Sequence, residues 1–149
     1  MRIIPIMFLA ALCALARTAV AAADTGHASI RAILVVASNQ HAKSDPRLAA
    51  YEPNLRRILR FESYRFAGEG AARIAQPGKG AVSLGGGHSV EIEMEKSDGK
   101  SLRARVNWTS GGKSLINMGH SLRPGVPAVL GGPSTGKEGE VWAVILVAE

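Results

Sequence analysis

Two apolar segments at opposite ends of the chain lack the alternation of a half-buried strand. Residues 30–37 (IRAILVVA) and 140–148 (EVWAVILVA) are apolar at nearly every position, which is typical of strands covered on both faces. We therefore expect them to be central strands. Shorter apolar runs predict three more strands, over residues 61–68, 81–84 and 126–130. Pro127 would confine the last of these to a sheet edge or to the start of a strand.

Strict alternation predicts a β-hairpin in the middle of the chain. Apolar residues alternate with Glu over 89–95 and with Arg over 102–108. Apolar side chains must face apolar ones, because a shift of one residue turns every side chain over. The expected cross-strand pairs are Met94 with Leu102, Ile92 with Ala104, Glu93 with Arg103 and Glu91 with Arg105. Gly99 would then take the left-handed position of a three-residue loop over 97–99.

One helical segment is predicted, and proline interrupts it. Asp45 followed by Pro46 is typical of an N-cap with proline at the first helical position. Apolar residues then recur at spacings of three and four, which lines one helical face. They are Leu48, Tyr51, Leu55, Ile58 and Leu59. Because Pro53 disfavours helical geometry at Glu52, we expect two short helical pieces that meet near that residue.

Glycine content points to the same fold class. Of the 17 glycines, all but one lie between Gly68 and Gly139, which favours strands joined by tight turns over helices. The complete pattern predicts a mainly β protein, an antiparallel β-sandwich or small barrel of about seven or eight short strands. The single helical segment would lie across it. Trp108 and Trp142 are the expected large core residues.

The N-terminal residues have the features of a secretory signal. Arg2 supplies a positive start, and the apolar run over 3–15 is shorter than the roughly 20 residues that a membrane span needs. Small-x-small cleavage patterns end at Ala21 and at Ala23. We interpret residues 1–23 as a secretory signal peptide. An uncleaved N-terminal anchor or a buried helix is the alternative.

The remaining residues, 24–149, have the length of one β-rich domain. Cys13 is the only cysteine and would leave with the signal, and a chain without thiols suits an oxidising compartment. We expect an exported protein, periplasmic or extracellular, with no later membrane span. Removal of Arg2 and Arg17 with the signal would lower the net charge from +6 to +4, and this positive charge favours anionic partners through a salt-sensitive attraction. A charge of about 2–8 is also ordinary for a small soluble domain.

The sequence contains no catalytic or metal-binding motif that meets its requirements. Residues 131–138 approximate a phosphate-binding loop, but Glu138 replaces the hydroxyl that holds magnesium, and a strand follows where a helix is needed. The histidines lack the spacing of a metal site. They are His27, His41, His88 and His120. No nucleophile-elbow motif occurs. We therefore predict no catalytic residue, cofactor or metal.

Three arginines are the only candidate site residues. Arg56 and Arg60 would share a helical face and, with Arg57, could hold an anionic group. The alternative is a solvated face opposite the apolar stripe. Because no aromatic residues are interleaved with these arginines, they do not form a stacking platform for single-stranded nucleic acid. Specific nucleic-acid binding is not expected.

One resemblance rests on residues spread over most of the domain. They are residues 33–39 (ILVVASN), Asp45-Pro46, Leu48, Tyr51, Leu55, Leu59, residues 61–65 (FESYR), Gly87-His88 and residues 129–133 (VLGGP). They resemble small exported bacterial proteins that have no assigned activity. The resemblance implies no catalytic residues for this chain.

A second resemblance covers a smaller part of the chain. Residues 122–132 (LRPGVPAVLGG), followed by the terminal apolar strand, are similar to the C-terminal part of secretin domains. This similarity implies a connection with envelope secretion machinery. The segment that lies between these two pieces in secretins is missing, and Pro127 departs from the secretin strand.

These observations together favour a binding protein over an enzyme. We expect an exported, non-enzymatic envelope module that contacts a protein partner or an anionic surface polymer. An exposed edge strand, such as the one near Val126, could accept a strand from a partner. The alternative is a small hydrolase that acts on an envelope polymer, with His88 or His120 as the base.

Overall fold

The fold consists of strands with two short helical pieces between the first and second strand. The computed structural model describes residues 26–95 and 102–149. In chain order the elements are β1 (His27–Ser38), the 3-10 helix η1 (Pro46–Leu48), α1 (Glu52–Ile58), β2 (Ser63–Ala75), β3 (Gly78–Gly85), β4 (His88–Met94), β5 (Leu102–Ser110), β6 (Lys113–Leu122), β7 (Ala128–Ser134) and β8 (Glu140–Ala148).

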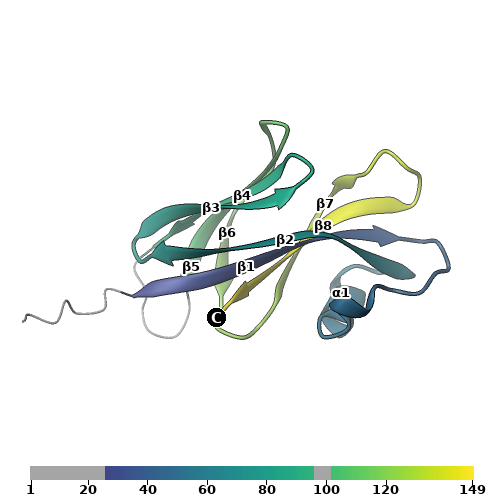
Figure 1. Ribbon diagram of the computed structural model, residues 1–149, viewed down its shortest axis with the longest axis horizontal. Coiled ribbons are helices and arrows are strands. Elements are labelled where there is room, and N and C mark those ends of the chain that lie inside the picture. The colour runs from purple at the N-terminus through teal and green to yellow at the C-terminus, as the bar shows by residue number, and fades with distance from the viewer. Residues whose placement is uncertain (1–25, 96–101) are drawn as a thin grey trace, which may run out of the picture.

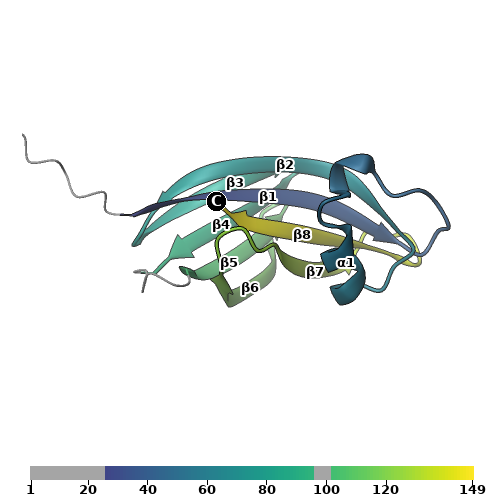
Figure 2. The same cartoon turned by 90° about the horizontal axis from the view of Figure 1, so that it is seen from below.

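The described strands form two antiparallel four-stranded sheets. Sheet A has the order β2-β1-β8-β7 and sheet B the order β3-β4-β5-β6. The two sheets pack face to face as a sandwich, not a closed barrel (Figure 1). Figures 1 and 2 together place β2 and β3 along one side of the sandwich and β6 and β7 along the other. The predicted mainly β sandwich is confirmed.

Strands β1 and β8 are the central pair of sheet A, as predicted, and β1 is covered on both faces from Ala32 onward. Ile30 and Leu34 point into the core between the sheets. Ile33 and Val35, on the opposite face of β1, belong to a second apolar cluster outside sheet A. Residues 143–148 of β8 are buried at every position. This double burial explains why neither segment alternates.

The helical segment covers the outer face of sheet A and makes a third layer (Figure 2). Asp45 caps η1 by accepting a hydrogen bond of 2.9 Å from the Arg47 backbone N–H. The Arg47 side chain also donates to this carboxylate, which lowers the pKa of Asp45 to about 2. Leu48 and Leu55 are fully buried beneath the two pieces. The predicted break is confirmed, because α1 begins at Glu52, directly before Pro53.

The register predicted for the β4–β5 hairpin is wrong by two residues. The observed pairs are Met94 with Ala104, Ile92 with Val106, Glu93 with Arg105 and Glu91 with Asn107. The apolar face is the predicted one, since a shift of two residues returns every side chain to its own face. Alternation therefore cannot choose between these registers. The choice between the two registers depends on core packing, and Trp108, which is buried beside Val90 in the observed register, is part of that packing. The predicted loop over 97–99 lies outside the described residues.

Glycine-rich and weakly patterned segments account for the other differences. Strand β2 continues past Gly68 to Ala75, although a shorter strand is predicted there. Strand β6 is not predicted, because its sequence KSLINMGHSL lacks alternation. The edge position predicted for the strand near Pro127 is confirmed, since β7 pairs with β8 and with no other described strand, and it begins directly after the proline. β7 also includes Gly131 to Ser134, which the sequence indicates as loop.

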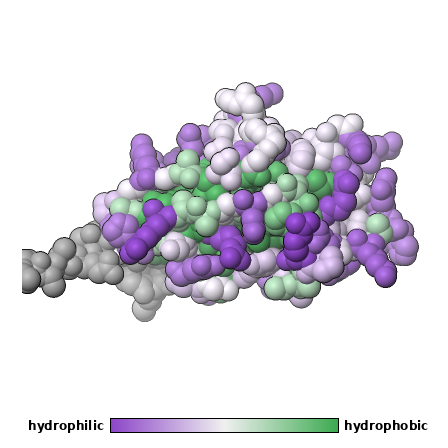
Figure 3. All heavy atoms as spheres, in the orientation of Figure 1, coloured by the Kyte–Doolittle hydropathy of each residue, from purple (hydrophilic) through white to green (hydrophobic). Residues whose placement is uncertain are grey.

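The β2–β3 side of the sandwich is sealed by close backbone packing. A Cβ at Gly68 would collide with the Leu84 carbonyl oxygen, and one at Gly70 would lie 2.5 Å from the Ser83 carbonyl oxygen. Figure 3 shows a band of apolar side chains along the middle of this side, bordered by polar ones. Only glycine permits strands from the two sheets to approach so closely.

We predict that Gly68→Ala lowers the free energy of unfolding by about 1–3 kcal/mol, because the new methyl group must displace the β3 backbone. Urea denaturation measures the change. Gly119→Ala is the matched control, since a Cβ there meets nothing within 4 Å, and its effect should stay within about 0.5 kcal/mol. Equal effects of the two substitutions would contradict the packing role of Gly68.

Candidate functional site

The outer face of sheet B is polar and faces solvent. Because side chains alternate along a strand, Val90, Ile92 and Met94 enter the core and the glutamates between them point outward. Strand β5 sends Arg103 and Arg105 to the same outer face. The alternation seen in the sequence therefore builds one apolar face and one charged face on the same sheet.

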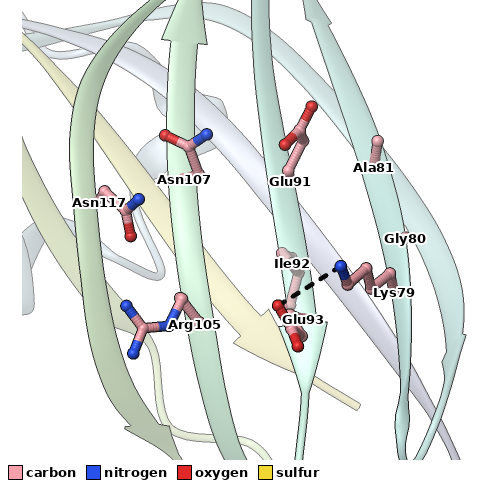
Figure 4. A pocket seen from close by; sticks show the side chains of 9 residues that line it. All are labelled: Lys79, Gly80, Ala81, Glu91, Ile92, Glu93, Arg105, Asn107 and Asn117. Atoms are coloured by element: carbon pink, nitrogen blue, oxygen red, sulfur yellow. Dashed lines mark ion pairs between the residues drawn. The ribbon is translucent and has the colours of Figure 1, made fainter.

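A shallow hollow lies in the middle of this outer face (Figure 4). Its volume is about 560 Å3, and its walls come from β3, β4, β5 and β6. The lining residues are Lys79, Gly80, Ala81, Glu91, Ile92, Glu93, Arg105, Asn107 and Asn117. This lining holds carboxylate, amide and cationic groups but no serine, cysteine or histidine. It can form hydrogen bonds and ion pairs with a ligand, and it lacks a nucleophile paired with a base.

The charges around the hollow are only partly paired. Lys79 Nζ lies 3.8 Å from Glu93 Oε2, and both side chains are exposed, so this pair contributes little to stability. Asn107 Oδ1 accepts a hydrogen bond of 2.6 Å from Ser114 Oγ. Arg105 stands opposite Glu93 in the register, yet its guanidinium lies on the β6 side of its strand (Figure 4). Arg105 is therefore available on the side of sheet B that ends at β6.

Strand β6 forms an open edge of sheet B. Among the described strands, β5 is its only hydrogen-bonded neighbour. The Glu95 N–H donates to the Arg103 carbonyl at 2.9 Å, so odd-numbered residues of β5 bond to β4 and even-numbered ones to β6. The even-numbered residues of β6 therefore bond to β5. The backbone groups of Asn117, Gly119 and Ser121, which lie between them, point away from the sheet. These groups are the free hydrogen-bonding groups of the edge.

The other sheet edges of the described chain are each obstructed. Strands β2 and β3 pack against one another through Gly68 and Gly70. Strand β7 contains Pro133 and loses regular pairing between Gly131 and Ser134, and the Leu59 side chain lies close to it. Proline, irregular pairing and covering elements are the usual protections of an edge. Strand β6 has ten residues and no proline.

Apolar side chains remain exposed beside the open edge. Met118 of β6 is 40% exposed, although its Cβ lies on the same face as buried Leu122. Val126, in the segment before β7, is 54% exposed. Ile116 is half-buried against the core. Backbone groups and apolar surface are thus available together along β6.

His88 belongs to an aromatic cluster that joins the two sheets. Trp108 Nε1 donates to His88 Nδ1 at 3.2 Å, and the Trp142 ring lies 4.6 Å from the imidazole centroid. His88 is buried, and this burial lowers its pKa. Because Nδ1 accepts a hydrogen bond from the indole N–H, it carries no proton itself. Trp108 is fully buried and Trp142 half-buried against the core, in agreement with the prediction.

The two histidines considered as hydrolase bases lie in different places. His88 is inside the aromatic cluster, with its Nδ1 occupied by Trp108. His120, half-buried on β6, lines a smaller hollow of about 210 Å3 together with Glu95 and Arg103. Over residues 26–95 and 102–149, no three His, Cys, Asp or Glu side chains come together as metal ligands would.

The three candidate arginines lie at the end of α1 and just after it. Arg56 donates to Glu52 Oε1 at 2.7 and 2.9 Å, so its guanidinium is already partnered. Arg57 donates to Asn54 Oδ1 at 3.4 Å. Helix α1 ends at Ile58, so the expected shared face of Arg56 and Arg60 does not form. An anion-binding role for these arginines stays a prediction.

The residues of the β6 edge were not identified from the sequence. The sequence feature that could have revealed this strand is the Gly111-Gly112 pair, which forms a tight turn with positive φ angles at both residues. A tight turn after the arginine-alternating strand predicts that a further strand follows. What this signal does not reveal is that the further strand ends the sheet.

Comparison of the chain with protein-family models, with curated proteins and with solved structures finds no match. In the described part of the chain, no helix combines the length and the apolar character that crossing a membrane requires.

We predict that His88 makes the protein less stable in mild acid. Its pKa is lowered in the folded state, so below the ordinary value of about 6.5 the unfolded chain takes up this proton more readily. The free energy of unfolding should therefore fall as the pH drops from 7 toward 5. His88→Asn, which keeps an acceptor for the indole N–H, should fall less. Denaturation at several pH values measures both slopes.

His41→Asn is the control, because the His41 side chain is fully exposed. It should retain the acid sensitivity of the unchanged protein. An unaltered slope in His88→Asn would show that His88 does not cause the effect.

Proposed function

We propose that this protein is an exported, non-enzymatic binding module of the cell envelope. Its working site is the free edge of β6, where an extended segment of a partner protein pairs with the backbone and adds a strand to sheet B. The partner is thus a protein with an exposed or unfolded segment. An anionic polymer is the other partner class that the basic charge suggests, and a binding experiment distinguishes the two.

The observation that carries this proposal is the contrast between the two sides of the sandwich. Glycine packing closes the β2–β3 side, whereas β6 offers Asn117, Gly119 and Ser121 to an incoming strand. Lys113, at its first position, is the one Lys, Arg, Asp or Glu that β6 contains. Natural proteins usually block such an edge with charge or proline. An unblocked edge supports pairing as its role.

The composition of the outer face supports a protein partner over an anionic polymer. The outward glutamates of β4 stand beside the outward arginines of β5. Opposite charges in neighbouring rows weaken the attraction that this face can exert on a uniformly negative chain. Backbone pairing at β6 does not depend on that balance.

We predict that peptides selected by the protein bind at β6. A library of random ten-residue peptides displayed on phage supplies the probes, and the selected sequences are then synthesised. Binding should protect the amide protons of Asn117, Gly119 and Ser121 from hydrogen exchange, because each would donate to the added strand. Nuclear magnetic resonance measures this protection residue by residue.

Gly119→Pro tests the edge directly. Proline removes one outward N–H without removing a bond to β5, so selected peptides should bind at least tenfold more weakly. Gly119→Ala, which keeps that N–H, is the matched variant and should bind as the unchanged protein does. Peptides that bind Gly119→Pro equally well, or that protect amides elsewhere, would refute the proposed site. Saturable binding of an anionic polysaccharide alone would replace it with the polymer alternative.

The envelope location has a separate test. Residues 1–23 lie outside the described residues, so the location rests on the sequence pattern. Fractionation of the native cells should place the protein in the periplasmic or extracellular fraction. Sequencing of its N-terminus should begin at Ala22 or Asp24. A cytoplasmic protein that begins at Met1 would contradict the export proposal.

A further inference from the structure

We propose that the strand bound by β6 carries acidic side chains at alternate positions, and that Arg103 and Arg105 recognise them. This inference rests on the proposed function, because it describes the partner of that same edge. The partner chemistry is then an extended peptide in which Asp or Glu alternates with apolar residues.

The register places both arginines directly behind the edge. Arg105 stands opposite Gly119 and Arg103 opposite Ser121. Neighbouring strands lie about 4.8 Å apart, so a strand added to β6 would run roughly 10 Å from β5. An extended arginine side chain can cover most of that distance if the residue between is small. Glycine and serine occupy the two intervening positions, and a Cβ at Gly119 would meet nothing within 4 Å.

The direction of the Arg105 side chain agrees with this use. Its guanidinium lies on the β6 side of β5, toward the strand that carries Asn117 (Figure 4). Glu93, its neighbour on the other side, forms its ion pair with Lys79 instead. Across the described residues no ion pair joins Arg103 or Arg105 to a carboxylate. Their charges are therefore available to a ligand at the edge.

Two further cations border the strand. Lys113 is the first residue of β6, and Arg123 directly follows its last residue. Both are exposed. Acidic residues are not part of β6, so the charged side chains of the strand and of the residue after it are cationic. Opposite charge speeds encounter with an acidic segment and discriminates against a basic one.

The inward-facing side chains of β6 determine which residues the partner needs between its acidic positions. Met118 faces inward and is 40% exposed, so a strand added beside it can cover it with an apolar side chain. Because side chains alternate, the partner needs apolar residues inward and acidic residues outward. Strand β4 has that pattern within this protein: its glutamates lie beside the β5 arginines, and its apolar residues enter the core.

Three synthetic ten-residue peptides provide the test. They share alternating valines and differ in carrying Glu, Gln or Lys at the positions between them. The Glu peptide should bind tightest and the Lys peptide weakest. Each arginine should contribute roughly two- to fivefold, the range of exposed cross-strand charge pairs. The preference for Glu over Gln should shrink as salt is raised.

Arginine variants then assign the preference to its source. Arg103→Gln/Arg105→Gln should lose most of the preference for the Glu peptide over the Gln peptide, with little change in its affinity for the Gln peptide. Arg73→Gln, an exposed arginine of β2 on the opposite side of the sandwich, is the control with the same kind of charge change. It should keep most of the preference. Isothermal titration calorimetry measures each affinity.

The outcomes separate this inference from the proposed function. Equal binding of the Glu and Gln peptides, weakened by Gly119→Pro, would overturn acidic recognition and leave strand addition standing. A preference of undiminished size in Arg103→Gln/Arg105→Gln would also overturn it. Binding of none of the three peptides, together with failure of the phage selection, would remove both proposals.

Discussion

Double burial of the central strand pair is the constraint on which the rest of the structure depends. Strands β1 and β8 bury apolar side chains on both faces, so sheet A must be covered twice. Sheet B covers the inner face. The outer face needs a second cover, which η1 and α1 supply through Leu48 and Leu55. The three layers thus follow from two segments that cannot leave either face in water.

Sealing one side of the sandwich has a consequence for the other. Gly68 and Gly70 bring β2 against the backbone of β3, so the two sheets are joined along that side. Each sheet then ends at its far strand. Proline and irregular pairing disrupt β7, whereas β6 retains regular extended backbone along most of its length. Within residues 26–95 and 102–149, the one unprotected edge therefore arises from the asymmetry of the fold, and the proposed function uses it.

The charge pattern of sheet B connects the fold to the proposed partner. The glutamate row of β4 lies beside the arginine row of β5, and the uncharged row of β6 follows. An acidic strand added to β6 would complete the alternation of charge, with Arg105 reaching over Gly119. The aromatic cluster around His88 has a separate role. It ties β4 and β5 to β8 through Trp108 and Trp142, with an imidazole that loses its acceptor nitrogen if it is protonated.

Local pattern in the sequence determines which segments are strands, which side chains enter the core and where the helical segment begins. Alternation in β4 and β5, double burial in β1 and β8 and the cap at Asp45 are all readable, because each depends on residues close in the chain. Only tertiary structure decided the register of Glu93 against Arg105, the end of α1 before Arg60 and the open edge at β6. Alternation is unchanged by a shift of two residues, so it cannot set the register. Whether a strand lies at the edge of a sheet depends on how strands distant in the sequence pair and pack.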